Sequence, residues 1–595
     1  MQANLEDQRE EHLMHVGQLM QRSMERLRWD FRRVADWERD QAVTKIDEIH
    51  GPAFVRHMNT ADKFASEWSP ILGASHRTIK LADLSKEFKQ FVRIPREREL
   101  STGDNEHMMG PITEAEILAA IAALNRHKAA GPDGLNNDFY KDTQALMVPA
   151  LERVCNGIMN GDEMPPSFLE ALIIPLRKKG DSADAMDYRP ISLLQTSYKI
   201  FAKVLATQLQ AILPRLIGHS QQGFVHGRQM QKTVMMMLAQ LLTAEDEMNV
   251  DADSSRIIPL LDFKNAYDTV DREFIYETLR AFGFNEAFID LMRRMHTDTS
   301  ASFLVNGEQS KARAVESGIR QGCPLAPLLF LLAAEILGLA IQQNPDLTGL
   351  PVPSLEGVRH IFSAFVDDST VFLERATQLK RTMELVRRFG ALSGLHVQPT
   401  KSQIIFLNTA IQLREYGGIA VLQHSDTVRY LGYEVETGQL TNKNWVARIR
   451  KIQRRLATAT RIATNVENRV LILNAIVLPS ILFTAAVFEM PAWAEKEICN
   501  ITKQFLWKHA TGTEVSRNKV NPGLLVTPKK AGGVGLASFT IAIKTQYIKH
   551  AIQWPLQRQD AYFAAWRTWA YRGVSPDIAR HPSENKLLAN QNRFR

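Results

Sequence analysis

Three aspartates stand at the ends of apolar, strand-like runs. Asp367 and Asp368 interrupt the run Ile361–Leu373, and Asp262 closes a similar run far upstream. Carboxylates among apolar neighbours are costly to bury unless they meet a cation or water. If the two strands lie side by side, Asp262 and Asp367 come together as the hard oxygen ligands that paired Mg²⁺ ions prefer. The pattern predicts a phosphoryl-transfer site at the tip of a hairpin.

A third segment, Glu316–Phe330, combines turn-forming residues with polar side chains. Gly318 and Gly322 permit close backbone approach, and Arg320–Gln321 projects polar groups from an otherwise apolar region. Such a segment could support a base and a sugar. It could equally be a loop that caps the apolar helix expected at Leu328–Ile341, and the residues alone leave both interpretations open.

The elements that must position these residues are a mixture of helices and strands. An amphipathic helix is predicted after Thr113, its expected N-cap, and should end at the turn-rich segment Lys128–Leu135. Strand-like runs alternate with helical stretches through the middle of the chain, which predicts the α+β class. These runs are Leu172–Pro175, Ile257–Leu261, Ala301–Val305, Phe362–Val366, Thr370–Leu373 and Ser402–Leu407.

The composition allows several domains and a polyanionic partner. The chain has 595 residues, of which 45% are hydrophobic, and a formal net charge of +7. Its cysteines, Cys155, Cys323 and Cys499, are too far apart in sequence to predict a disulfide framework or a zinc site. This usage favours a reducing compartment, so we expect an intracellular protein, with nucleus and cytoplasm both open.

The ends of the chain and one apolar stretch bear on membrane association. The first residues lack a secretory signal, and Val470–Phe488 is interrupted by polar residues, so we expect a core helix broken at Pro479 rather than a membrane span. Near the N-terminus, a basic helical face is expected, which is either solvated or in contact with nucleic acid. Its arginines are Arg22, Arg26, Arg28, Arg32 and Arg33.

Taken in order, these segments resemble the reverse transcriptases of non-LTR (LINE-type) retrotransposons. The likeness extends over roughly residues 110–550, and all of its blocks are colinear with the family's motifs. The first blocks are Lys128–Gly134, Ile174–Gly180 with Tyr188–Leu193, and Gln222–Arg228. The others are Leu261–Asp268 (motif A), Gly318–Pro327 (motif B), Phe365–Asp368 (motif C), Ser393–Lys401 (motif D) and Tyr430–Gly432 (motif E).

The resemblance implies a right-hand polymerase with fingers, an antiparallel palm sheet and a thumb. Residues 1–110 would form a helical N-terminal extension, 111–440 the fingers and palm, 441–511 a helical thumb and 512–595 a C-terminal extension. The basic helix Asn444–Leu456 would lie along template–primer phosphates. Motifs of an endonuclease or a Cys/His knuckle are not recognisable, so we expect the polymerase portion of a truncated or fragmented reading frame.

The resemblance also assigns a role to each candidate residue. Asp262 and Asp367 would bind two Mg²⁺ ions, for which Mn²⁺ could substitute, and Asp368 would be the supporting carboxylate. Lys401 would protonate the departing pyrophosphate. The substrate-binding residues would be Phe263, Tyr267, Arg177, Arg189, Gln321 and Gly322, and the primer grip would be Tyr430, Leu431 and Gly432.

Tyr267 is expected to decide between deoxyribonucleotides and ribonucleotides. Its ring would clash with a 2′-hydroxyl, which favours a DNA product. RNA-templated RNA polymerases usually carry a ribose-binding carboxylate at this offset from the first metal ligand, whereas Asp268 stands one residue further on. The alternative is that Tyr267 is an ordinary core aromatic.

The function implied is RNA-directed DNA synthesis from an RNA template, a DNA primer and deoxynucleoside triphosphates. The alternatives are a domesticated or inactive RNA/DNA-binding scaffold and a maturase-like RNA-folding factor. Four positions depart from the family's usual residues, and none is a metal ligand: Asp187, Ala326, Val366 and Gln398. Oligomeric state is left open by these residues.

Overall fold

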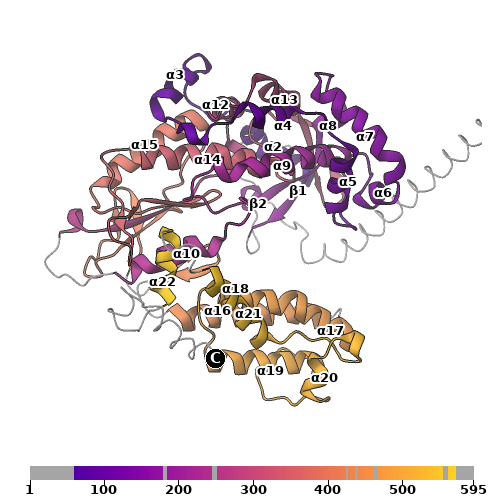
Figure 1. The fold of residues 1–595 in the computed structure, drawn as a ribbon, viewed down its shortest axis with the longest axis vertical. Coiled ribbons are helices and arrows are strands. Elements are labelled where there is room, and N and C mark those ends of the chain that lie inside the picture. Colours follow the sequence, from indigo (N-terminus) through magenta and orange to yellow (C-terminus); the bar gives the residue numbers. More distant parts are fainter. Residues whose placement is uncertain are drawn as a thin grey trace, which may run out of the picture. The chain divides into compact units, whose positions relative to one another are not determined.

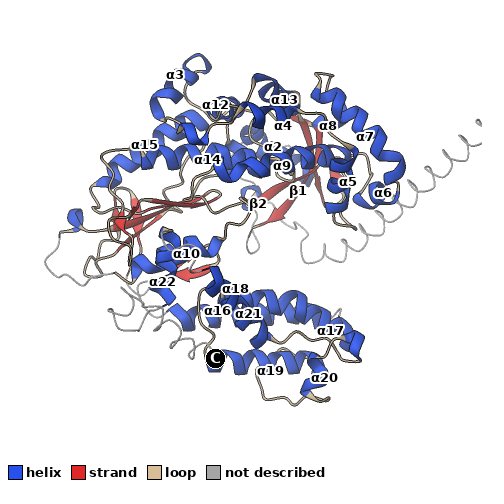
Figure 2. Ribbon diagram, in the orientation of Figure 1, coloured by secondary structure: helices blue, strands red, loops and turns tan. Residues whose placement is uncertain are grey.

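The computed structural model describes residues 59–178, 184–243, 251–423, 426–435, 440–460, 463, 465–553 and 560–570. The N-terminal arginines from Arg22 to Arg33 therefore lie outside the described residues. Contacts divide the chain into two units. Unit 1 comprises Met1–Arg228, Asp262–Asn344 and Arg381–Gln398; unit 2 comprises Gln229–Leu261, Pro345–Lys380 and Pro399–Arg595. Both contain helices and strands, which confirms the α+β class (Figures 1 and 2).

The sheet of unit 1 has the order β2-β1-β4-β5, and β6 also pairs with β4. Its central strand β1 is antiparallel to β2 and parallel to β4, so the sheet is mixed. Two of the predicted strands fall inside β1 and β4. The bounds are β1 Glu170–Arg177, β2 Tyr188–Leu193, β4 Ser300–Val305, β5 Glu308–Gln309 and β6 Arg313–Ala314.

Most of the described residues of unit 1 are helical. Thr113 caps α5 as predicted, because its hydroxyl accepts a hydrogen bond from the Glu116 amide and the Glu116 side chain binds the Thr113 amide in return. The helix ends at Ala123, before the turn-rich segment. The helices are α2 Thr60–Leu72, α3 Leu81–Phe91, α4 Thr102–Met109, α5 Glu114–Ala123, α6 Asn137–Asp142, α7 Gln144–Met159, α8 Pro166–Leu169, α9 Thr196–Leu216, α11 Ala266–Thr269, α12 Arg272–Ala281, α13 Glu286–His296, α14 Ala326–Gln342 and most of α15 Gln378–Ser393.

Unit 2 contains a six-stranded sheet in the order β12-β13-β11-β3-β10-β9. All its pairs are antiparallel except β11–β13, which is parallel. The bounds are β3 Ile257–Leu261, β9 Phe362–Phe365, β10 Asp368–Val371, β11 Gln403–Phe406, β12 Glu415–Tyr416 and β13 Ile419–Val421. Two hairpins complete the strands of this unit: β7 Leu350–Pro351 with β8 Arg359–His360, and β14 Val428–Tyr430 with β15 Tyr433–Val435.

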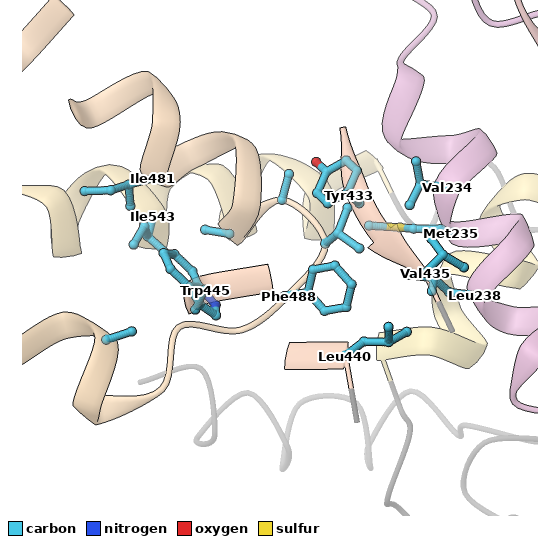
Figure 3. Packing of buried hydrophobic residues seen from close by; sticks show 14 of the residues in the cluster. Val234, Met235, Leu238, Tyr433, Val435, Leu440, Trp445, Ile481, Phe488 and Ile543 are labelled. Atoms are coloured by element: carbon cyan, nitrogen blue, oxygen red, sulfur yellow. The ribbon is translucent and has the colours of Figure 1, made fainter. Parts of the chain in front are cut away.

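The predicted basic helix is the middle of α16, Leu440–Thr460. Its apolar positions Trp445, Ile449, Ile452 and Leu456 are buried, as a helical period requires. Figure 3 shows this core, in which Trp445, Ile481 and Ile543 come from different helices and Tyr433 lies beside Phe488. The helices of unit 2 are α10 Met230–Leu241, α16, α17 Val466–Ile472, α18 Leu478–Ala485, α19 Ala492–Lys508, α20 Pro522–Val526, α21 Phe539–Gln553 and α22 Ala561–Ala570.

The apolar stretch near Pro479 forms a continuous helical run rather than the predicted broken helix. A π-helical turn at Leu473–Val477 joins α17 to α18, and Pro479 lies in the first turn of α18. Proline lacks an amide proton, and its position directly after the widened turn avoids the expected break. Val466–Ala485 is long and apolar enough to cross a membrane by composition alone, but Val470, Leu473 and Ile481 are buried in the core.

Candidate active site

The three predicted metal ligands lie at the ends of β3 and β10 or in the adjoining turn. β3 is an inner strand of its sheet and pairs with β10 through Leu261 and Ser369. Asp262 follows Leu261 directly, and Asp368 is the first residue of β10. The predicted start of this strand at Thr370 was therefore two residues late.

A two-residue turn joins β9 to β10. Phe365 pairs with Asp368, which leaves Val366 and Asp367 as the turn. Val366 is buried and has a φ of 61°. A β-branched residue in the left-handed region costs of order 1–3 kcal/mol, a strain that is typical of functional sites. The strained position immediately precedes Asp367.

The carboxylates of the described residues do not form a cluster of three. No group of three or more His, Cys, Asp and Glu side chains that could hold a metal ion occurs among the described residues. A pair of carboxylates remains compatible with that finding. Asp262 and Asp367 are half-buried and Asp368 is exposed, so water and a hydrated ion can reach them.

In unit 1, the turn that follows Asp262 packs directly against the loop that contains Gln321. The amide of Ile319 donates to the Tyr267 carbonyl at 2.9 Å, and the amide of Gly318 donates to the Val270 carbonyl at 3.0 Å. A Cβ atom on Gly318 would lie 2.6 Å from the carbonyl oxygens of Tyr267 and Asp268. The close approach predicted for this loop is confirmed, and it requires glycine.

Strand β2 holds the other side of the same loop. The amide of Ser192 donates to the backbone carbonyl of Gln321 at 2.7 Å. Gly322 has a φ of 122°, and a Cβ atom there would lie 2.4 Å from the Ser192 carbonyl oxygen. The structure thus brings together Gln321, Gly322 and the turn that carries Tyr267, although these residues are far apart in sequence.

Arg320 does not project from the loop, contrary to the prediction. It is buried, its guanidinium stacks 4.4 Å from the centre of the Tyr198 ring, and it donates to the Phe168 carbonyl at 2.9 Å. Because a buried guanidinium needs its donors satisfied, Arg320 is anchored inward and serves the packing of the loop.

Two aromatic residues in the segment after Asp262 are held by ring contacts. The half-buried Tyr267 ring stacks on Phe330 of α14, with ring centres 4.5 Å apart and planes at 18°. Phe263 packs edge-to-face on Phe389 of α15 at 6.3 Å. Both rings therefore pack against a neighbouring helix, and Tyr267 is more than an isolated surface aromatic.

Asp268 was not predicted as a site residue, yet it is the buried acid of this region. The residue is 6% exposed, and its carboxylate accepts hydrogen bonds from the Gln321 side-chain amide at 3.0 and 2.9 Å. Burial raises the pKa of Asp268 to about 7, against the lowering effects of Gln321 and of the positive charge of Lys178. The sequence signal was an acid in an otherwise buried helical turn.

The predicted phosphate-binding residues lie at one end of the β1–β2 pair. Arg177 pairs with Tyr188 and its guanidinium lies 5.9 Å from the Tyr188 ring centre. Arg189 is exposed and alternates along β2 with the buried Tyr188 and Pro190, so it projects from the opposite face of the strand. The exposed Lys178 donates through Nζ to the Met186 carbonyl at 2.9 Å.

Lys401 and the predicted primer grip belong to unit 2. Lys401 is exposed in the turn before β11. Tyr430 is buried and its hydroxyl accepts a hydrogen bond from Thr370 of β10 at 2.8 Å. Leu431 and Gly432 form the two-residue turn of β14–β15, both with positive φ, as the common tight hairpin requires. The hairpin is thereby tied to the strand that begins with Asp368.

Cationic side chains of α16 lie near one another and near Arg429 of β14. Burial and the charges of Arg448, Arg455, Arg429 and Arg454 together lower the pKa of Lys451. Mutual repulsion of this kind costs free energy and is relieved by an anionic partner such as a phosphate backbone. We call these five residues the α16 basic cluster.

Comparison with known proteins adds a family to this geometry. Residues 176–435 match the family described as reverse transcriptase (RNA-dependent DNA polymerase). The matched segment includes β3, β9, β10 and the loop at Gly318–Gly322.

Several relatives carry names of mobile elements. The transposon TX1 uncharacterized 149 kDa protein of Xenopus laevis is 26% identical over 451 residues, covering 74% of this chain and 33% of its own length. The retrovirus-related Pol polyprotein from type-2 retrotransposable element R2DM of Drosophila melanogaster is 21% identical over 506 residues, covering 82% and 44%. The RNA-directed DNA polymerase from mobile element jockey of Drosophila funebris is 23% identical over 406 residues, covering 64% and 42%. This chain spans less than half the length of these relatives, and the matches confirm the predicted resemblance.

Proposed function

We propose that this chain, which is similar to the reverse transcriptases of non-LTR retrotransposons, is an RNA-directed DNA polymerase that extends a DNA primer on an RNA template. The observation that carries the proposal is the pairing of β3 with β10 through Leu261 and Ser369. Asp262 directly follows Leu261, and Asp368 directly precedes Ser369, next to the turn that contains Asp367. Residues far apart in sequence thereby place carboxylates at the adjoining ends of two neighbouring strands.

The fold is assigned accordingly. The six-stranded sheet of unit 2 is the palm, the β1–β2–β4 sheet of unit 1 belongs to the fingers, and α16 to α19 form the thumb. Four members of the α16 basic cluster lie on the thumb and Arg429 lies on β14, and the cluster binds the phosphates of the template–primer duplex. The β14–β15 hairpin, anchored through Tyr430, supports the primer end.

The carboxylates fit divalent cations. Asp262 and Asp367 supply hard oxygen donors that water can reach, and Asp368 supports them. Bound there, two Mg²⁺ or Mn²⁺ ions would supply the Lewis acidity that activates the primer 3′-hydroxyl and neutralises the triphosphate. Arg189 binds the triphosphate, and Lys401 gives a proton to the departing pyrophosphate. Arg177 lies with Tyr188 on the other face of the β1–β2 pair, so Arg189 is the stronger candidate of the two.

The test is primer extension on poly(rA)/oligo(dT) with deoxythymidine triphosphate and Mg²⁺. Asp367→Asn should lower incorporation at least about 10³-fold, because a carboxylate ligand is lost while the size of the side chain is kept. Asp290→Asn is the matched control, since Asp290 is exposed on α13. Circular dichroism and hybrid binding should be unchanged in both variants.

Three outcomes would count against the proposal. Full activity of Asp367→Asn would remove the metal role of that carboxylate. A wild-type protein that binds the RNA–DNA hybrid but adds no nucleotide, in Mg²⁺ or in Mn²⁺, would favour the scaffold. Splicing of a host intron without nucleotide incorporation would instead favour the maturase-like factor.

We further propose that Tyr267 restricts the enzyme to deoxyribonucleotides. The ring stacks on Phe330, and this contact holds it in place against a 2′-hydroxyl. Tyr267→Ala should raise the relative kcat/KM for ribonucleotides by about 10- to 100-fold, measured by competition between the two triphosphates. An unchanged ratio would make Tyr267 an ordinary packing residue, and Tyr267→Phe, which keeps the ring, should behave as the wild type.

A further inference from the structure

Asp268 and Gln321 form a polar pair within a largely apolar part of unit 1. Both carboxylate oxygens of Asp268 lie within 3.0 Å of the Gln321 side-chain nitrogen. The pair borders a small pocket with room for about one water molecule, whose walls include Ala171, Ile173 and Pro190. A carboxylate in such surroundings, with one neutral amide as its hydrogen-bonding partner, loses much of its hydration.

The loop is also held by backbone hydrogen bonds in which these two side chains take no part. Backbone hydrogen bonds from Ser192 to Gln321, from Ile319 to Tyr267 and from Gly318 to Val270 already fix it. Replacing a buried polar pair by apolar side chains of similar size is often neutral or stabilising. A costly acid at a place where structure alone does not require one indicates a functional demand.

We propose that Asp268 is a positioning residue for nucleotide binding. It holds the side-chain nitrogen of Gln321 inward and thereby turns the side-chain oxygen of Gln321 outward, as a hydrogen-bond acceptor for the incoming nucleotide. The inference rests on the proposed function, because it deepens the role of Gln321 in the nucleotide site. Asp268 itself touches neither substrate nor metal. It acts through the side chain that it orients.

The protonation state of Asp268 should control this orientation. Burial raises the pKa of Asp268 to about 7, and Lys178, at the end of β1, opposes the rise. Two other cations on neighbouring elements point elsewhere: Arg320 donates to the Phe168 carbonyl and Arg272 of α12 donates to the Gly318 carbonyl at 3.0 Å. The ionised carboxylate of Asp268 can only accept hydrogen bonds, so it binds the nitrogen of the Gln321 side-chain amide. The protonated carboxyl group can also donate a hydrogen bond, which favours the flipped amide with its oxygen toward Asp268.

The experiment measures KM and kcat for deoxythymidine triphosphate on poly(rA)/oligo(dT), with the full chain, between about pH 6 and pH 8. In the wild type, KM should rise as pH falls through about 7, because the acid becomes protonated. Asp268→Asn resembles the protonated acid at every pH, so its KM should be raised about tenfold and should not follow that rise. The kcat should change much less, and Asp290→Asn should follow the wild type.

A second variant separates positioning from folding. Gln321→Met has a similar length but no amide, so its KM should also be high and free of the transition near pH 7. The double variant should be no worse than either single variant, because each removes the same interaction. Should Asp268→Asn fail to fold, by melting temperature and hybrid binding, Gln321→Met alone carries the test.

The outcomes distinguish this inference from the proposed function. A wild-type chain without nucleotide incorporation defeats the proposed function itself. If the wild type is active but Asp268→Asn keeps the wild-type KM and its pH dependence, only the positioning role of Asp268 is rejected. The same conclusion follows if Gln321→Met keeps the wild-type pH dependence, or if the effects of the two variants add.

Discussion

The Tyr267 turn with its glycine loop in unit 1 and the core beneath α16 in unit 2 are held together by different forces. In the first, backbone amides meet carbonyl oxygens at positions where only glycine fits. In the second, large apolar side chains such as Trp445 and Phe488 fill a common interior (Figure 3). Adding one methyl group should therefore destabilise the glycine loop of unit 1, and removing side-chain volume should destabilise the core of unit 2.

The largest effect is expected from a substitution that removes a large side chain from the unit 2 core. Trp445→Ala removes a fully buried indole and its hydrogen bond to the Glu489 carbonyl, which is 2.9 Å long. Loss of a buried aromatic costs about 3–5 kcal/mol, so the melting temperature of the protein should fall steeply and activity should fall with it. Val446→Ala, one residue along α16 and exposed, should leave melting nearly unchanged. Equal melting of the two variants would show that α16 is not held by this core.

The second prediction tests the unit 1 site with a single methyl group. Gly318→Ala places a Cβ atom 2.6 Å from two carbonyl oxygens at a φ of 69°. Gly134→Ala is the matched control, because Gly134 has a φ of 75° with open space around it. Both variants carry the backbone cost of about 1–2 kcal/mol, and Gly318→Ala adds roughly 1–3 kcal/mol of overpacking.

Activity separates these two variants further. Gly318→Ala should lower incorporation about 100-fold, because the loop must shift away from Tyr267 and small displacements near reacting groups are costly. Gly134→Ala should keep most activity. The measurement is primer extension at a temperature below both melting transitions. Similar activity of the two variants would mean that the close approach has no role in the site.

The contrast between the two regions also explains what the sequence could predict. The segment Asn444–Leu456 predicted the basic helix found in α16, and Thr113 predicted the start of α5, because such signals are local and periodic. The pairing of Asp268 with Gln321 spans 53 positions and follows no period, so only the folded chain discloses it. The arrangement of the metal ligands was predicted from the apolar runs that end at these aspartates and from the family likeness, and it remains a prediction.

Two misses have local physical causes. The strand β10 begins earlier than predicted because the hairpin turn has only two residues. This turn requires a left-handed conformation at Val366, which glycine or asparagine usually adopts. The helical run through Pro479 continues because a π-helical turn precedes the proline, and composition does not encode such a turn. Both features require backbone geometry that residue preferences disfavour.

The smallest expected effect concerns the surface of unit 2 rather than its interior. Arg454→Gln removes an exposed member of the α16 basic cluster without touching the core. If Arg454 meets one phosphate, the slope of log affinity for an RNA–DNA hybrid against log salt should shrink by about 0.9, with only a few-fold loss of affinity. Fluorescence anisotropy between about 50 and 200 mM salt measures it. Arg153→Gln, exposed on α7 of unit 1, is the charge-matched control. Because the same unit charge is removed in both variants, equal slopes would mean that net charge alone acts on the duplex, and α16 would lose its role as the phosphate-binding face.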